Sequence, residues 1–470
     1  MKVSRMNQQE KIEYMLNEPA TRLVCQMAVP TIISMLVSSF YNMADTFFVG
    51  RISTQATAAV GVVFSVMAFI QACGFFFGHG SGNYISRKLG AGEFEDANKM
   101  AATGFVSAFL TGIFAGVLGL IFLEPLSMAL GSTPTILPYT KEYLGIILLG
   151  TPFMMSSLVL NNQLRFQGSA SYAMVGIVTG AVLNIGLDPL FIFVFDMGVA
   201  GAALATTISQ IVSFVLLVLM TRKGGNIRIH LRDFSPSWYY FKEIIRGGLP
   251  SLCRQGLGSV AQICMNWAAG FYGAEFGDAA IAAMSIVNRV TTFANSALIG
   301  FGQGFQPVCG MNYGAGKYHR VREAFFFCVK YAFVFLLVLS AVGFIFARPL
   351  VMLFRREDAE VIRIGALALR LQCLAFPLNA WIVMSNMMLQ SIGKAVRASI
   401  VAAARQGLFF LPFIWILPKF FGLLGVQMCQ TWSDVCSFLI AVPLGISVLR
   451  EMAAAGGVEA KAAGTQAQDM

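Results

Sequence analysis

Long, nearly unbroken runs of apolar residues dominate this chain. A run of about 20 apolar residues is long enough to cross a bilayer as an α-helix. Twelve such runs lie near residues 24–50, 56–80, 99–123, 137–160, 170–194, 199–221, 245–270, 279–307, 324–347, 364–387, 396–417 and 422–449. Continuous segments such as YAFVFLLVLSAVGFIFA exclude the short alternating strands of a transmembrane β-barrel. The pattern therefore predicts an all-α integral membrane protein with twelve spanning helices.

The polar segments between these runs are short. The first 23 residues mix acidic and basic side chains without an apolar core, so we expect no signal peptide there. The longest polar loop runs from Thr221 to Ile244, which leaves no room for a large soluble domain. Only 12% of the residues are charged, against about 25% in soluble domains, which also favours a membrane protein.

Positive charge is distributed unevenly between alternate loops. If the N-terminus is inside, the inner loops carry roughly three times as many Lys and Arg residues as the outer ones, and Arg165 is among the inner set. We therefore expect both termini in the cytoplasm. The formal net charge of +10 is spread over many loops, which argues against a role in nucleic-acid binding.

The two halves of the chain repeat. The pairs Gly78 and Gly302, Gly90 and Gly314, and Gly198 and Gly422 are each 224 residues apart. Each copy of the repeat has six helices. Because six is an even number, both copies begin on the same side of the membrane and are related by a pseudo-two-fold axis along the membrane normal. Parallel repeats of this kind build two-lobed transporters whose central cavity opens alternately to each side.

This repeat predicts the domain organisation. We expect an N-terminal six-helix lobe at 1–221, a cytoplasmic linker at 222–244, a C-terminal six-helix lobe at 245–450 and a cytoplasmic tail at 451–470.

Two carboxylates, Asp45 and Asp188, interrupt predicted membrane helices. Because a charge in hydrocarbon is costly, such a residue indicates a functional site. Asn184 precedes Asp188 by one turn on the same face, and Thr206 lies at similar depth, roughly 7–11 Å below the outer surface. Two close carboxylates cannot both ionise cheaply, so the cluster should take up a proton, or Na⁺ in its place. The alternatives are structural: Asp45 could pair with Arg51 or cap a helix, and Asp188 could mark a local break at Pro189.

Pro30 lies inside the first predicted helix, which also carries Asp45. A proline removes a backbone hydrogen bond and permits a kink. A bend of this helix coupled to proton loading is one hypothesis, and a static kink is the alternative.

The C-terminal half carries different polar chemistry. Candidate cavity residues there are Arg254, Gln255, Asn288, Gln303, Arg405, Gln406 and Asp434. Buried arginines need a counter-charge or water, so Arg254 and Arg405 should face Asp434 or a wet cavity. Asp434 could be a third loading site, but an ion pair with an arginine is favoured. For His79, packing is favoured over a proton relay.

Nothing in the sequence indicates an enzyme. There is no nucleophile with a matching base, no cluster of metal ligands and no Walker A motif, and the nine cysteines show no CxxC spacing. We expect no cofactor, no metal beyond Na⁺ at Asp45, Asn184 and Asp188, and H⁺ or Na⁺ as the coupling ion.

Several motifs resemble one known family. They are AVPTIISMLVSSFYNMADTFFVGR ending at Arg51, the pair Asn184 and Asp188, GFGQGFQPV at 300–308, NYGAGK at 312–317, and RQG at 254–256 and 405–407. Nearly the whole chain resembles the multidrug and toxic compound extrusion (MATE) family, in its bacterial multidrug branch.

This resemblance implies two six-helix bundles that form a V around a central cavity. It implies an antiporter in the bacterial inner membrane that exports cationic or amphipathic small molecules against H⁺ or Na⁺. By resemblance, the coupling site falls on Asp45, Asn184, Asp188 and Thr206, and the helix-bending proline on Pro30. Carboxylates that some members carry in the C-terminal lobe are replaced here by Arg254, Gln255 and Asn379, which places coupling in the N-terminal lobe.

Three other functions are alternatives to a multidrug exporter: a flippase, a channel and a membrane-embedded enzyme. A flippase for lipids or lipid-linked glycans, of the same superfamily, would suit a cavity containing Arg254 and Arg405. A channel or a membrane-embedded enzyme would belong to a different class. The expected partners are the bilayer and small-molecule substrates, with no nucleic acid, and the expected state is a monomer.

Overall fold

The computed structural model describes residues 6–276, 279–354 and 358–468, except for the side chains of Thr54, Phe276 and 456–468. The first half contains α1 (Gln8–Asn17), α2 (Ala20–Val49), α3 (Thr54–Gly90), α4 (Phe94–Ile121), α5 (Leu123–Ala129), α6 (Leu137–Phe166), α7 (Ala170–Pro189), the π-helix η2 (Leu190–Val194) and α8 (Gly198–Thr221). The predicted all-α membrane fold is confirmed.

The second half begins with the short 3₁₀ helix η3 (Leu231–Asp233). It continues with α9 (Trp238–Tyr272), η4 (Ala274–Phe276), α10 (Ala279–Gly314), α11 (Tyr318–Ile345), α12 (Ala347–Met352), α13 (Ala359–Ala375), η5 (Phe376–Leu378) and α14 (Asn379–Ser391). It ends with α15 (Ala395–Ala403), the π-helix η6 (Ala404–Leu408), α16 (Phe410–Phe421) and α17 (Leu423–Gln468). Three helices predicted as continuous are thus interrupted, at η2, η5 and η6.

Within the described residues, ten helical segments are long and apolar enough to cross a membrane. The remaining two long helices are α9 and α10, with 35 and 36 residues. Polar side chains such as Gln262, Asn288 and Gln303 lower their hydropathy. Such side chains are tolerated in a membrane helix when they face the protein interior or a wet cavity. The two helices complete the twelve that the apolar runs predict.

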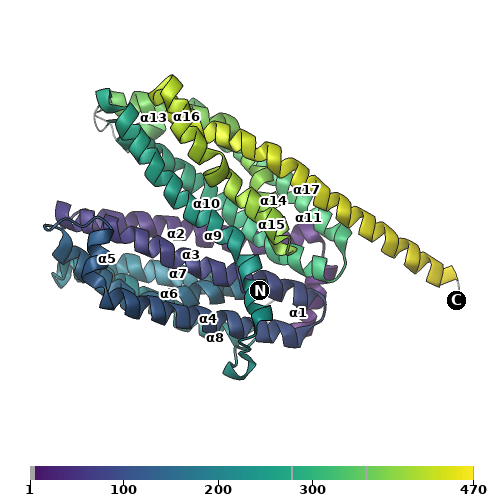
Figure 1. Cartoon of the computed structure of the whole chain (residues 1–470). Coiled ribbons are helices and arrows are strands. Elements are labelled where there is room, and N and C mark those ends of the chain that lie inside the picture. Colours follow the sequence, from purple (N-terminus) through teal and green to yellow (C-terminus); the bar gives the residue numbers. More distant parts are fainter. Residues whose placement is uncertain (1–5, 277–278, 355–357, 469–470) are drawn as a thin grey trace.

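The two halves form a V (Figure 1). Helices α2–α8 make the N-terminal lobe and α9–α17 the C-terminal lobe. The lobes converge at the end where α1 lies, here called the α1 side, and diverge towards the opposite end, here called the far side. The lobes meet where α3 packs on α9 and α2 on α10.

Glycines make this inter-lobe contact close. A Cβ on Gly80 of α3 would lie 2.4 Å from the carbonyl oxygen of Ile244, and one on Gly304 of α10 would lie 2.4 Å from the Cα of Ala28. Gly90 and Gly314 end α3 and α10, and a Cβ on either would lie 2.0 Å from a carbonyl oxygen of the other lobe. Of the three glycine pairs that reveal the sequence repeat, Gly90 and Gly314 lie at the contact between the lobes.

Helix α1 lies across both lobes on the α1 side. Its start is fixed by a capping box between Asn7 and Glu10. Lys11 is buried and donates hydrogen bonds to Ser169, which precedes α7, and to Asn226, which follows α8. From the C-terminal lobe, Lys317 donates to the carbonyl oxygen of Leu16 at 3.0 Å. This helix therefore ties the two lobes together.

One residue differs from its expected place. Arg165 is 1% exposed and lies near the end of α6 rather than in a loop. It donates to Gln303 of the other lobe and to Asn162, and it contacts His79. Its terminal nitrogens are thus hydrogen-bonded at the inter-lobe contact, while Nε has no partner among the described residues. Arg165 therefore does not belong in the count of loop charges.

Candidate functional site

The central cluster of the N-terminal lobe lies between α7 and α8. Asp188 is fully buried, Asn184 is 1% exposed and Thr206 is 3% exposed. With its amide oriented to satisfy its neighbours, Asn184 donates to Asp188 Oδ2 at 3.1 Å and accepts from the Thr206 hydroxyl at 3.3 Å. The structure therefore brings these three residues into one hydrogen-bonded group.

Asp188 lies at the end of the regular α-helix α7. Pro189 ends α7, and the chain continues through the π-helix η2. A proline cannot donate a backbone hydrogen bond, and single π-turns are frequent at functional sites because they alter the direction of nearby side chains.

Asp45 of α2 approaches the same cluster. Its charge and that of Asp188 are near enough to interact. One oxygen of each carboxylate, Oδ1 in both cases, is buried without a hydrogen-bond partner among the described residues. Arg51 places its guanidinium 4.5 Å from the centre of the Phe47 ring, and no ion pair joins it to Asp45 in the described part of the chain. The two unpartnered oxygens are positions where a proton or a cation would be stabilised.

Two tyrosines at this site were missed in the sequence. Tyr41 of α2 and Tyr143 of α6 lie within electrostatic range of both Asp45 and Asp188. Tyr41 precedes Asp45 by one helical turn, so its position on the same face was a usable signal. Nothing in the sequence marks Tyr143, because its helix meets the site only through tertiary packing.

A cavity adjoins the cluster. It has a volume of about 120 Å³, and its lining includes Tyr41, Gln71, Asn184, Thr206 and Gln210. The walls combine hydroxyl and amide groups with apolar side chains such as Phe64 and Met67. The cavity wall is therefore partly polar and partly apolar.

Pro30 lies inside α2, which is continuous from Ala20 to Val49. The Ser34 hydroxyl donates to the Pro30 carbonyl oxygen at 2.9 Å. On the other side, a Cβ on Gly300 of α10 would lie 2.7 Å from the Cα of Ile32. Pro30 therefore lies between Ala28 and Ile32, two positions where α2 packs closely on α10 of the other lobe.

The C-terminal lobe contains a separate polar network. Arg405 donates from Nε to Asp434 Oδ1 at 2.7 Å, which is the favoured ion pair. Arg254 instead donates to Asn386 at 3.1 Å. Asn288, Arg405, Gln406 and Asp434 line one cavity, whereas Gln303 lies at the inter-lobe contact with Arg165. Gln255 is partly buried on α9, next to Arg254.

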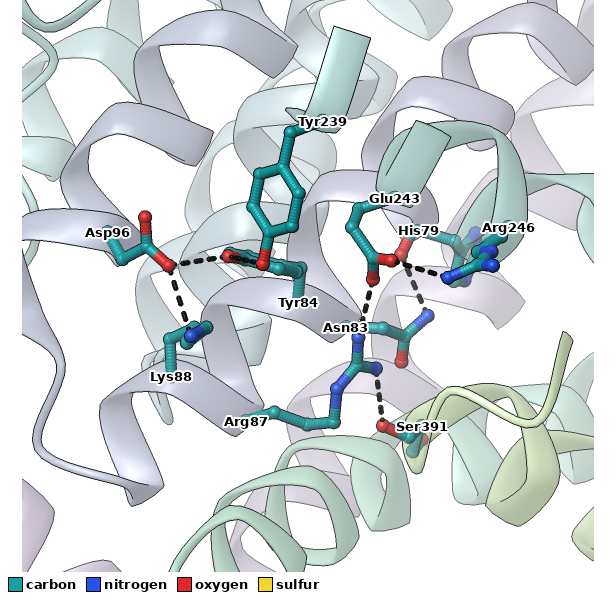
Figure 2. Close-up of polar contacts among 10 residues, drawn as sticks. All are labelled: His79, Asn83, Tyr84, Arg87, Lys88, Asp96, Tyr239, Glu243, Arg246 and Ser391. Carbon is teal, nitrogen blue, oxygen red and sulfur yellow. Dashed lines mark hydrogen bonds and ion pairs between the residues drawn. The ribbon is translucent and has the colours of Figure 1, made fainter. Parts of the chain in front are cut away.

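Polar contacts close the V on the α1 side (Figure 2). Arg87 of α3 donates to the carbonyl oxygen of Ser391 at 3.0 Å and pairs with Glu243 of α9 at 3.5 Å. The hydroxyl groups of Tyr84 and Tyr239 lie 3.0 Å apart. These bonds join the lobes and must break if the α1 side opens.

The comparisons with known proteins agree with this architecture. The MatE family model matches residues 30–190 and again 255–416, once in each lobe and over more than half of the chain. This chain belongs to the MATE family.

Among its relatives is the multidrug export protein MepA of Staphylococcus haemolyticus, 27% identical over 92% of this chain and 94% of that protein. A solved outward-facing structure of a multidrug resistance MATE transporter of the MOP superfamily has a TM-score of 0.87 at 28% identity, covering 93% of this chain and 98% of that one. A MATE protein solved in the straight conformation has a TM-score of 0.88 at 27% identity, with coverages of 93% and 98%.

Proposed function

We propose that this protein is a secondary active exporter of cationic or amphipathic small molecules, driven by H⁺ or Na⁺ antiport. The observation that carries the proposal is the buried group of Asp188, Asn184 and Thr206, with Asp45 nearby and a cavity alongside. The name of its staphylococcal relative supports multiple drugs as substrates.

The proposed cycle follows from charge. When the carboxylates are unloaded, the site is anionic and attracts a cationic substrate. Binding of H⁺ or Na⁺ at the unpartnered oxygens of Asp45 and Asp188 neutralises the site, which weakens the hold on the substrate. A ligand can shift a two-state equilibrium only through unequal binding to the two states, and this change of charge supplies that inequality.

The membrane orientation follows from the positive loops. With both termini in the cytoplasm, the α1 side is cytoplasmic and the V opens outward. Ion loading from outside would then release substrate and favour the return to an inward-open state. This return requires the contacts of Arg87 and Tyr84 with the other lobe to break.

The test is ethidium transport in proteoliposomes, with a pH gradient or a Na⁺ gradient imposed separately. We expect one gradient to drive transport and Asp188→Asn to abolish it. Asp196→Asn is the matched control: Asp196 is an exposed acid with φ 52°, a conformation that Asn tolerates.

Transport by Asp188→Asn at the wild-type rate would refute coupling in the N-terminal lobe. If neither gradient drives export by the wild type, the flippase becomes the better description, and uptake of a fluorescent lipid should be measured instead.

A further inference from the structure

A second polar cavity lies within the C-terminal lobe. Its volume is about 110 Å³, and it lies among α9, α10, α13, η6 and α17. Six carboxamides line it: Gln262, Asn288, Asn295, Gln372, Gln406 and Gln430. Arg405 and Asp434 are the charged residues of its lining.

Asp434 lines this cavity, and its two oxygens accept three hydrogen bonds from neighbouring side chains. Oδ1 accepts from Arg405 Nε at 2.7 Å and from Gln430 at 2.8 Å, and Oδ2 accepts from Asn379 at 2.9 Å. Only 4% of its side chain is exposed. Because three donors occupy its oxygens, Asp434 fixes the position of the neighbouring Arg405 side chain.

Arg405 is the accessible member of the pair. Its side chain is 20% exposed, and only its Nε donates to the protein among the described residues. A guanidinium has five N–H donors, so its two terminal nitrogens remain free to bond a ligand in the cavity. A ligand oxyanion that enters the cavity could accept hydrogen bonds from these nitrogens.

The backbone holds this arginine in place. Arg405 lies in the π-helix η6, and the Ser433 hydroxyl of α17 donates to its carbonyl oxygen. A π-turn inserted in a spanning helix breaks the regular ladder and is frequently found at functional sites. Asp434 holds the Nε atom of Arg405, and Ser433 holds its backbone carbonyl oxygen. Together these two contacts restrict the orientation of the terminal guanidinium nitrogens.

We propose that this cavity binds the carboxylate of a zwitterionic amphiphile. The inference rests on the proposed export function and assigns a binding site to one chemical group of its substrates. A planar guanidinium matches a carboxylate through two parallel hydrogen bonds, and the surrounding amides donate further. The two lobes then differ in polarity: the N-terminal lobe presents carboxylates and the C-terminal lobe presents a guanidinium.

The test uses two dyes that differ by one methyl group. Rhodamine 110 carries a free carboxylate, and rhodamine 123 is its methyl ester. Their affinities are measured by fluorescence anisotropy on purified protein in detergent, which needs no ion gradient. The ratio of the two dissociation constants reports the carboxylate contact alone, because the rest of the dye is common to both.

The variant is Arg405→Gln combined with Asp434→Asn, which removes the guanidinium without leaving a buried carboxylate unpaired. We expect the preference for the acid over the ester to fall by about 10- to 100-fold, the range for a hydrogen bond to a charged group. The affinity for rhodamine 123 should change little, which also shows that the variant is folded. Arg370→Gln is the matched control, because Arg370 donates to the carbonyl oxygen of Phe344 and does not line the cavity.

An acid-to-ester ratio that is the same in the wild type and the double variant would overturn the proposal. So would failure of the wild-type protein to bind rhodamine 110. A separate experiment tests the export function. If that function is wrong, ethidium is not transported in proteoliposomes, and this result does not depend on the ratio of dye affinities measured in detergent.

Discussion

Gly90→Ala tests whether the glycine contact holds the α1 side of the V closed. Gly90 ends α3, and an added Cβ would lie 2.0 Å from the carbonyl oxygen of Met311 in α10. Gly314→Ala makes the reciprocal change, 2.0 Å from the carbonyl oxygen of Arg87. In each case the obstacle is backbone, which cannot move aside as a flexible side chain can.

The magnitude follows from overpacking. Extra methyl groups in a close-packed contact cost about 1–3 kcal/mol. If the open state lacks this contact, the equilibrium shifts by about 5- to 150-fold towards it. Alanine also favours the helix over glycine by about 0.5–1 kcal/mol, but this term is the same in both states and cancels.

The assay is a distance measurement by pulsed electron spin resonance. Spin-labelled non-natural residues at Glu95 and Val396, both exposed and one in each lobe, report the separation on the α1 side. We expect a single short distance in the wild type and a second, longer population in both alanine variants. Gly61→Ala is the matched control, because Gly61 lies in the same helix and a Cβ there meets nothing within 4 Å.

Unchanged distance distributions in both Gly90→Ala and Gly314→Ala would refute the reasoning. A longer population in the Gly61→Ala control would refute it equally, since it would trace the effect to helix propensity. The double variant should show the same longer distance with a larger population, because opening the lobes relieves both clashes at once.

Two further outcomes are expected. Burial lowers the pKa of Lys11 to about 7, so between about pH 7 and 10 the docked α1 binds fewer protons than the free helix. Docking should therefore strengthen as pH rises through that window; hydrogen exchange of α1 measures this, and Lys11→Met should remove the dependence. Arg405→Gln alone leaves the buried Asp434 unpaired and should cost about 3–5 kcal/mol; thermal unfolding should show most of it restored when Asp434→Asn is added.

The membrane helices and their pairing into repeats could be predicted from the sequence. Hydrophobic run length decides whether a segment can span a bilayer, and this is a local property. The contact of Asn184 with Asp188 is local as well, because residues four apart share one face of a helix. The sequence also places Gly90 and Gly314 at equivalent positions of the repeat, but it does not show that they pack against the opposite lobe.

Only the tertiary structure decided which faces meet. Arg165 reads as a loop charge, yet it is buried because α6 carries it to Gln303 of the other lobe. Tyr143 reaches the carboxylates, and Arg405 and not Arg254 reaches Asp434, through contacts between helices distant in sequence. An apolar helix in a membrane carries little sign of which face packs on protein, because lipid and neighbouring side chains are alike in polarity. Sequence therefore determined the helices and the local pairing of Asn184 with Asp188. Packing between helices determined the contact between the lobes, the partners of the charged side chains and both cavities.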